Sequence, residues 1–99
     1  MTLKMFSILD TKSDTFLSPF FFSTAGQATR AFKDLVNDPN TTISRHPGDY
    51  RLFIIGLFDD SKGLVTPLET IEPLGYATDY QDLRSDLPVG VSPFGKRSA

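Results

Sequence analysis

His46 and Asp49 are the nearest approach in this sequence to a catalytic pair, because the chain contains a single histidine. A histidine beside a carboxylate could act as a general acid or base. Only Pro47 and Gly48 separate the two residues, however, and such residues favour a turn. There is no cysteine and no second histidine to build a thiolate or paired-imidazole metal site. We therefore expect no catalytic residue, no metal, no cofactor and no enzymatic activity.

The carboxylates Asp59 and Asp60 lie in a different kind of sequence, Asp-Asp-Ser-Lys-Gly ending at Gly63. Aspartate is favoured in turns because its side chain bonds to nearby backbone N–H groups. We interpret this segment as a hairpin turn with Gly63 in the left-handed conformation, rather than as a cation site. The sequence also lacks a glycine-rich phosphate loop and a nucleophile elbow.

Aromatic and basic side chains suggest a second chemistry, the binding of nucleic acid. Nine Phe and three Tyr make up 12% of the chain. Proteins hold single strands by stacking bases on aromatic rings and contacting phosphates with a few basic residues. The candidates follow one another in the sequence, and one ring of Phe20–Phe22 could join them: Arg30, Lys33, Arg45, His46, Tyr50 and Arg51.

The net charge limits this interpretation. Ten basic residues face twelve acidic ones, which gives a formal charge of −2. Proteins with general affinity for nucleic acid are usually basic, because their affinity comes from neutralising phosphates. Any binding must therefore use a local patch. The alternative, which the residue pattern alone favours, is that the aromatic rings form the core and the charges are solvated.

These candidates surround the segment Asp49–Phe58, which has the length and composition of a central strand. With a period of two, Tyr50, Leu52, Ile54, Gly56 and Phe58 would share one face, and Arg51, Phe53, Ile55 and Leu57 the other. Both faces are apolar, so each needs a cover. Burying each large side chain contributes about 1.5–3 kcal/mol. We expect a second copy of the chain to cover one face, giving a homodimer or higher oligomer, with the C-terminal tail or a ligand such as stacked bases as the alternative covers.

Two strands and a helix are expected before that central strand. Leu3–Asp10 and Thr15–Phe22 have strand composition and are joined by a polar turn, and Pro19 places the second at an edge or a bulge. A helix is expected from about Ala25 to Asn37, because Thr24 and Gln27 have the spacing of a capping box. Its apolar stripe comprises Ala28, Ala31, Phe32, Leu35 and Val36.

After the helix we expect a polar loop over Asn40–Gly48 and, beyond the central strand, an edge strand over Leu64–Leu68 followed by a short extended piece over Thr70–Tyr76. The fold class is therefore α+β, a small and mostly antiparallel sheet in the order β-β-α-β-β with one helix packed on one face. Residues 1–76 would form a single domain. Residues 77–99 would form an extended or partly disordered tail, because their apolar residues are sparse and aperiodic.

The chain begins without a basic region followed by a long apolar core, and no segment has the ~18 apolar residues of a membrane span. We expect a protein of the host cytoplasm with no membrane partner.

Three motifs, in this order and spacing, carry a resemblance to a known family: His46–Leu52, Gly56-Leu57-Phe58-Asp59 and Val65-Thr66-Pro67. Together with Met5–Asp10 and the helix around Arg30, they cover about residues 3–70. The chain resembles the small nonstructural protein of gokushoviruses, single-stranded DNA phages of the Microviridae, a family described as DNA-binding. The resemblance implies a role in the passage from double-stranded replication to single-strand synthesis and packaging, outside the capsid.

Three functional hypotheses follow. The first is an oligomeric DNA-binding protein that prefers single strands. The second is an oligomeric adaptor that binds a viral or host replication protein without contacting DNA. The third is a minor scaffolding component.

Overall fold

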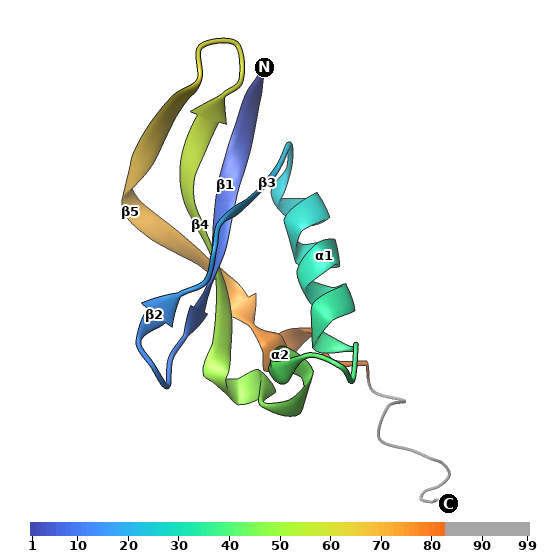
Figure 1. Ribbon diagram of the computed structural model, residues 1–99. Coiled ribbons are helices and arrows are strands. Elements are labelled where there is room, and N and C mark those ends of the chain that lie inside the picture. The colour runs from blue at the N-terminus through green and yellow to red at the C-terminus, as the bar shows by residue number, and fades with distance from the viewer. Residues whose placement is uncertain (83–99) are drawn as a thin grey trace, which may run out of the picture.

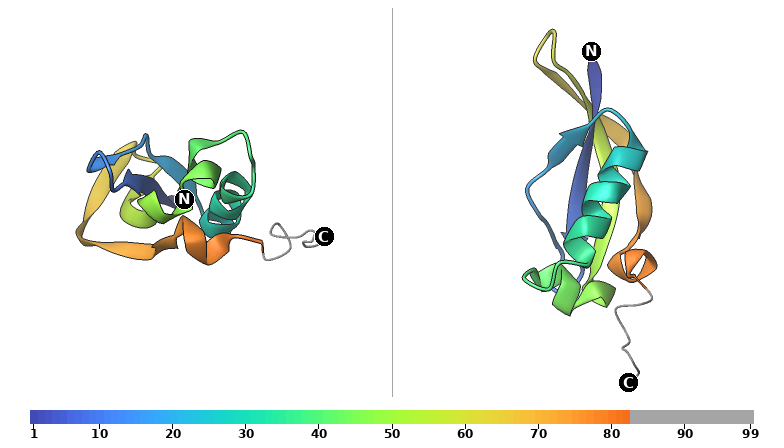
Figure 2. Two further views of the ribbon diagram at one scale, coloured as in Figure 1. Left: turned by 90° about the horizontal axis from the view of Figure 1, so that it is seen from below. Right: turned by 90° about the vertical axis from the view of Figure 1, so that its right-hand side faces the viewer.

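The computed structural model describes residues 1–82, in which one long helix packs against one face of a curled antiparallel sheet (Figure 1). Figure 2 shows this helix in front of the sheet when the molecule is turned by 90° about the vertical axis. The elements are β1 (Thr2–Asp10), β2 (Thr15–Phe16), β3 (Phe20–Phe22), α1 (Ala25–Val36), α2 (Thr42–Arg45), η1 (Pro47–Asp49), β4 (Tyr50–Asp59), β5 (Leu64–Tyr76) and η2 (Ala77–Tyr80).

The strand order is β2-β1-β4-β5, and β3 pairs with β1 on the same edge as β2. All pairs are antiparallel, which agrees with the predicted α+β class. The strand expected over Thr15–Phe22 is divided in two, because the chain leaves the ladder at the segment that contains Pro19, a residue without an N–H to donate. The hydroxyl of Ser7 donates a 2.6 Å hydrogen bond to the carbonyl of Leu17 and holds this detour.

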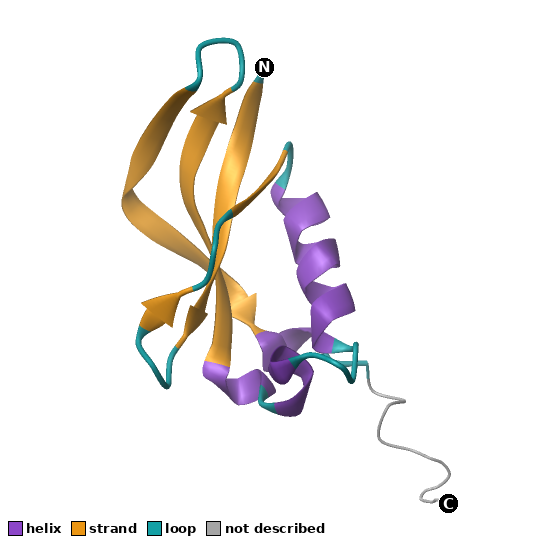
Figure 3. Cartoon of the chain, viewed as in Figure 1, coloured by secondary structure: helices purple, strands orange, loops and turns teal. Residues whose placement is uncertain are grey.

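Helix α1 begins with the predicted capping box. The N–H of Gln27 donates to the Thr24 hydroxyl, and the N–H of Thr24 donates to Gln27 Oε1, each at 3.2 Å. Both bonds satisfy N–H groups that the first turn of a helix leaves without partners. The stripe then buries Ala28, Phe32 and Val36 against the sheet. The prediction of a loop over Asn40–Gly48 is wrong in part, because this segment contains α2 and the start of η1 (Figure 3).

The core lies between α1 and the sheet. Its fully buried large side chains are Phe6, Phe32, Leu52 and Val36, which come from β1, α1 and β4. Phe20 and Phe22 pack against this cluster from β3, whereas Phe21 between them points to the other face, as the alternation of a strand requires.

A β-bulge in β4 changes which side chains share a face. Met5 pairs with Gly56, but the next residue of β1, Phe6, pairs with Ile54, so Ile55 is an extra residue. The predicted faces therefore hold only up to Ile54. Beyond the bulge, Gly56 and Phe58 lie on the face opposite α1, together with Phe53, while Leu57 lies on the helix side.

The second apolar face of β4 is partly covered by the chain itself. Phe53 is 7% exposed, because Phe16 and the Arg51 side chain lie over it. Ile55, Leu57 and Phe58 are half-buried. Phe53 is therefore removed from water within one chain, without a second copy.

The hairpin between β4 and β5 has Gly63 at φ +65°, the left-handed conformation expected from the sequence. Strand β5 lies at the edge of the sheet, as Pro67 indicated. It continues to Tyr76 as one strand, where the sequence predicted two shorter extended pieces, and its pairing to β4 has two irregularities.

The segment expected as the start of the tail packs on the body of the protein. Ala77 is fully buried, and the ring of Tyr80 meets that of Phe32 edge-on with centroids 5.5 Å apart. The Tyr80 hydroxyl donates a 2.6 Å hydrogen bond to the carbonyl of Leu74. The rest of the expected tail, residues 83–99, lies outside the described residues.

Candidate nucleic-acid interface

Arg51 lies between two aromatic rings on the sheet face opposite α1. Its guanidinium carbon is 5.2 Å from the centre of the Phe53 ring and 4.9 Å from that of Tyr76. Both distances are within the range of attractive cation–π contacts. Within residues 1–82, Arg51 makes no ion pair or hydrogen bond through its side chain, and its Nε is buried without a partner. The guanidinium is thus held between two rings, and none of its N–H groups has a hydrogen-bond partner within residues 1–82.

Further rings continue across the same face. Phe16 of β2 meets Phe53 edge-on at a centroid distance of 5.6 Å, and Phe21 of β3 meets Phe58 of β4 at 5.4 Å. These contacts reach across β1 and join β2 and β3 to β4. We call this surface the open face and define it by six residues: Phe16, Phe21, Arg51, Phe53, Phe58 and Tyr76.

Several rings of the open face are accessible. Phe16 is 42% exposed, Phe21 39% and Tyr76 37%. Val65, whose neighbour across the ladder is Phe58, is 50% exposed. Isolated exposed apolar residues are common on protein surfaces, but a group of rings on one sheet face with a cation between two of them is what stacking interfaces use.

The predicted basic patch is not one surface. Arg30 and Lys33 lie exposed on α1, and Arg45 and His46 lie at the end of α2, all on the helix side of the sheet. Arg51 projects from the opposite side, because its neighbour Leu52 points into the core beneath α1. Lys33 also has a partner, the Asp82 carboxylate at 3.5 Å.

Tyr50, expected as a stacking ring, belongs to the core and is only 8% exposed. Its burial raises the pKa of the phenol above its usual value, and the carboxylates of Asp10 and Asp49 raise it further, with a small opposing effect from Arg45. The ring therefore stabilises the fold and presents no face to a base.

A sequence model of a family described as phage ORF5 protein matches residues 3–80, which is most of the chain and nearly all of its described part. The chain belongs to the phage ORF5 protein family. This confirms that it is a phage protein, the coarser part of the resemblance noted in the sequence. No curated protein and no solved structure matches it.

For this phage ORF5 protein, the sequence analysis did not name three rings of the open face as candidate site residues: Phe16, Phe53 and Tyr76. The period of two did place Arg51 and Phe53 on a shared face, and that signal was correct. The position of Tyr76 beside Arg51 had no local signal, because it depends on the register of β5 against β4. The face on which Phe16 lies could not be predicted, because the expected strand Thr15–Phe22 is divided into β2 and β3.

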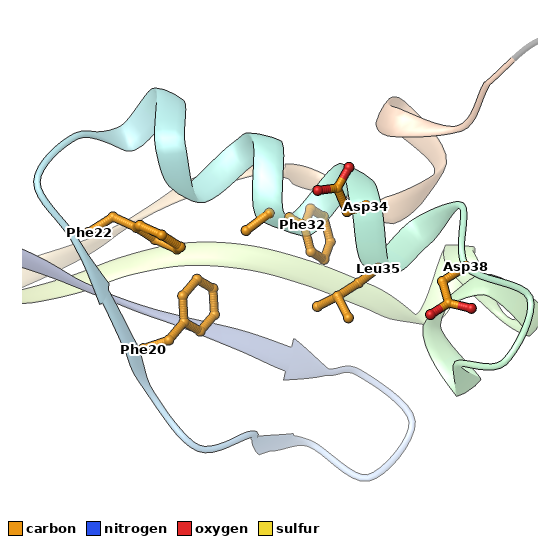
Figure 4. A pocket seen from close by; sticks show the side chains of 7 residues that line it. Phe20, Phe22, Phe32, Asp34, Leu35 and Asp38 are labelled. Atoms are coloured by element: carbon orange, nitrogen blue, oxygen red, sulfur yellow. The ribbon is translucent and has the colours of Figure 1, made fainter.

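The helix side carries a separate feature, a groove of about 420 Å³ between β3 and α1 (Figure 4). Phe20, Phe22, Ala31 and Leu35 form its apolar walls over Phe32, and Asp34 and Asp38 lie at one end. Two carboxylates make this groove unsuitable for a phosphate backbone.

Between residues 1 and 82 no three His, Asp or Glu side chains come together in a way that could hold a metal ion. Nor does any helix of that part have the length and hydrophobicity to cross a membrane.

Proposed function

We propose that this phage ORF5 protein binds single-stranded DNA through the open face of its sheet. In this proposal it is a nonstructural protein of a gokushovirus, acts in the host cytoplasm, and serves viral genome replication or the switch to single-strand synthesis and packaging. The observation that carries the proposal is Arg51, an unpaired guanidinium fixed between Phe53 and Tyr76 on an accessible face.

Arg51 differs from the other basic residues in its position between two rings rather than in its lack of a carboxylate partner, because Lys33 is the only Lys or Arg within residues 1–82 that pairs with a carboxylate. Within residues 1–82, seven Lys and Arg face eleven Asp and Glu, a formal net charge of −4. Carboxylates are thus in excess, yet none pairs with Arg51 in this part of the chain. A planar guanidinium with free N–H donors can bind a phosphate through two parallel hydrogen bonds. Its ligand is therefore expected to be an anion.

The rings around Arg51 supply the second requirement. Stacking of a base on an aromatic side chain contributes about 1–3 kcal/mol per base and tolerates any sequence. Tyr76 and Phe16 flank the Arg51–Phe53 pair, and Phe21 extends the surface along β1. A flexible single strand can place successive bases on such rings, whereas a duplex keeps its bases stacked inside.

The small number of basic residues on the open face determines how strongly the proposed binding depends on salt. Only one of the predicted basic residues, Arg51, lies on the open face, so stacking rather than phosphate neutralisation must supply most of the affinity. Each phosphate contact adds roughly −0.7 to the slope of log affinity against log salt for a single strand. We therefore expect a slope of about −0.7 to −1.5, corresponding to one or two contacts.

A second candidate function is self-association or adaptor binding through the same face. The exposed aliphatic side chain of Val65 favours it, because it offers apolar area opposite Phe58 but no ring for a base. A stable interface buries about 800 Å² per partner. In that case the open face would bind a second copy, or a viral or host replication protein, and would not contact DNA.

Fluorescence anisotropy with a labelled oligo-dT separates the two. DNA binding predicts saturable binding at low salt that weakens about tenfold on Tyr76→Ala, given the 1–3 kcal/mol of one stacked base. Leu35→Ala is the matched control, because Leu35 is as exposed as Tyr76, 37%, but lies on the helix side. Absence of binding, together with a dimer in light scattering that Tyr76→Ala dissociates, would establish the second function instead.

A further inference from the structure

The groove between β3 and α1 is an apolar surface that the DNA-binding proposal does not use. Its walls are the rings of Phe20 and Phe22 and the side chains of Ala31 and Leu35 (Figure 4). Leu35 belongs to the apolar stripe of α1, yet its side chain lines the open groove and is 37% exposed. Asp34 and Asp38 give one end of the groove a negative charge.

The described chain ends at the C-terminal end of α1, next to Asn37, which precedes Asp38 of the groove. The N–H of Asp82 donates a 2.9 Å hydrogen bond to Asn37 Oδ1, and Asn37 Nδ2 donates to the carbonyl of Tyr80 at 3.0 Å. The carboxylate of Asp82 also lies 3.5 Å from Lys33 Nζ. These contacts hold residue 82 against Lys33 and Asn37, which do not line the groove, so the chain has to pass around the end of α1 to reach it.

The segment that follows has the composition that this groove would accept. Residues 83–91 contain one basic residue, Arg84, and one acidic residue, Asp86, so Arg84 alone supplies the charge that complements the two carboxylates of the groove. Arg84 comes two residues after Asp82. The apolar residues Leu87, Val89 and Val91 follow at a spacing of two, which places them on one side of an extended chain.

The segment is also long enough. Helix α1 has 12 residues and spans about 18 Å at 1.5 Å per residue. Nine residues in extended form, from 83 to 91, reach about 30 Å at roughly 3.3 Å each. The segment can therefore pass around the end of α1 and run along the groove towards Phe22.

We propose that residues 83–91 dock in the groove of their own chain, with Arg84 beside Asp34 and Asp38 and with Leu87, Val89 and Val91 between α1 and β3. A link of a few residues keeps the segment at a local concentration of about a millimolar or more, which favours docking within one chain over docking between chains. Docking covers Leu35 and leaves the open face free, so this inference is independent of the proposed DNA binding.

Disulfide trapping tests the inference, since the natural chain has no cysteine. In the full-length double variant Leu35→Cys with Val89→Cys, mild oxidation should give an internal disulfide within a monomer. The matched control is Val65→Cys with Val89→Cys, because Val65 is well exposed but lies on the opposite side of the sheet. We expect the Leu35 pair to close about tenfold faster or more, as its higher effective concentration requires.

Equal closure rates for the two pairs would overturn the proposal, and so would a disulfide formed mainly between two chains. A second measurement avoids the engineered cysteines. In an amide NMR spectrum of the full-length protein, Val91→Asp should shift the signals of Phe20, Phe22 and Leu35, whereas Ser98→Asp should not. Unchanged groove signals in the Val91 variant would likewise overturn it.

Discussion

The guanidinium carbon of Arg51 lies 4.9 Å from the centre of the Tyr76 ring, because the register between β4 and β5 places the two residues directly opposite each other. The pairing shifts immediately beyond this point, between Leu52 and Phe53. On its other side the guanidinium contacts the ring of Phe53 in its own strand. The fold thus holds the guanidinium of Arg51 between two rings from neighbouring positions of β4 and β5.

Arg51→Lys should weaken binding to a single-stranded oligonucleotide although the charge is kept. An ammonium group lacks the planar fork that stacks between rings and binds phosphate bidentately. Loss of about 1–2 kcal/mol predicts a roughly five- to thirtyfold higher Kd, measured by anisotropy at low salt. Arg45→Lys, an equivalent change on the helix side, serves as the control. Equal effects of the two substitutions on Kd would contradict a specific contact between Arg51 and the oligonucleotide.

Gly56→Ala should destabilise the fold. A Cβ at this position would lie 2.9 Å from the carbonyl oxygen of Thr66 and 3.4 Å from Cα of Pro67, both backbone atoms of β5. Strand β5 must shift to make room, at a cost of about 1–3 kcal/mol in the free energy of unfolding. Gly48→Ala provides the comparison, because nothing lies within 4 Å of its Cβ. Urea unfolding of both variants measures the difference; a Gly56 variant as stable as the Gly48 variant would contradict the close packing.

Phe32→Ala and Leu35→Ala compare the two sides of the α1 apolar stripe. Phe32 is fully buried, so its truncation should cost about 3–5 kcal/mol. That is a large share of a typical domain stability of about 5–15 kcal/mol. Leu35 is partly exposed in the groove and should cost clearly less. If chemical denaturation gave similar losses for the two, the core described here would be incorrect.

Alkaline pH should destabilise the protein through Tyr50. Burial raises the pKa of its phenol in the folded state, whereas the unfolded chain ionises near the ordinary value of 10.0. Stability is therefore fully present below pH 10 and decreases as the pH rises from there through the folded-state pKa. Tyr50→Phe should flatten this decrease in a pH series of urea unfolding curves. An unchanged slope would show that Tyr50 is not the group responsible.

The sequence predicted features that depend on local chemistry. Thr24 and Gln27 gave the start of α1, because a capping box is a matter of spacing along the chain. Gly63 indicated the hairpin turn, since only a residue without a side chain adopts positive φ at little cost. Pro67 indicated an edge strand, because proline has no N–H to donate to a neighbouring strand.

Features that depend on contacts between strands could not be predicted in this way. The bulge at Ile55 moves Gly56 and Phe58 to the other face, and a strict period of two has no means of detecting it. Tyr50 and Arg51 are adjacent in sequence but lie on opposite sides of the sheet, so grouping basic and aromatic residues by sequence proximity mixed two surfaces.

Mapping an oligo-dT onto the uniformly 15N-labelled protein by NMR tests the central claim most directly, because it reports the binding surface residue by residue. The account predicts saturable shifts at Phe16, Arg51, Phe53 and Tyr76, with the amides of α1 unchanged. Shifts concentrated at Arg30, Lys33 and Arg45, or no shifts at all at low salt, would contradict it.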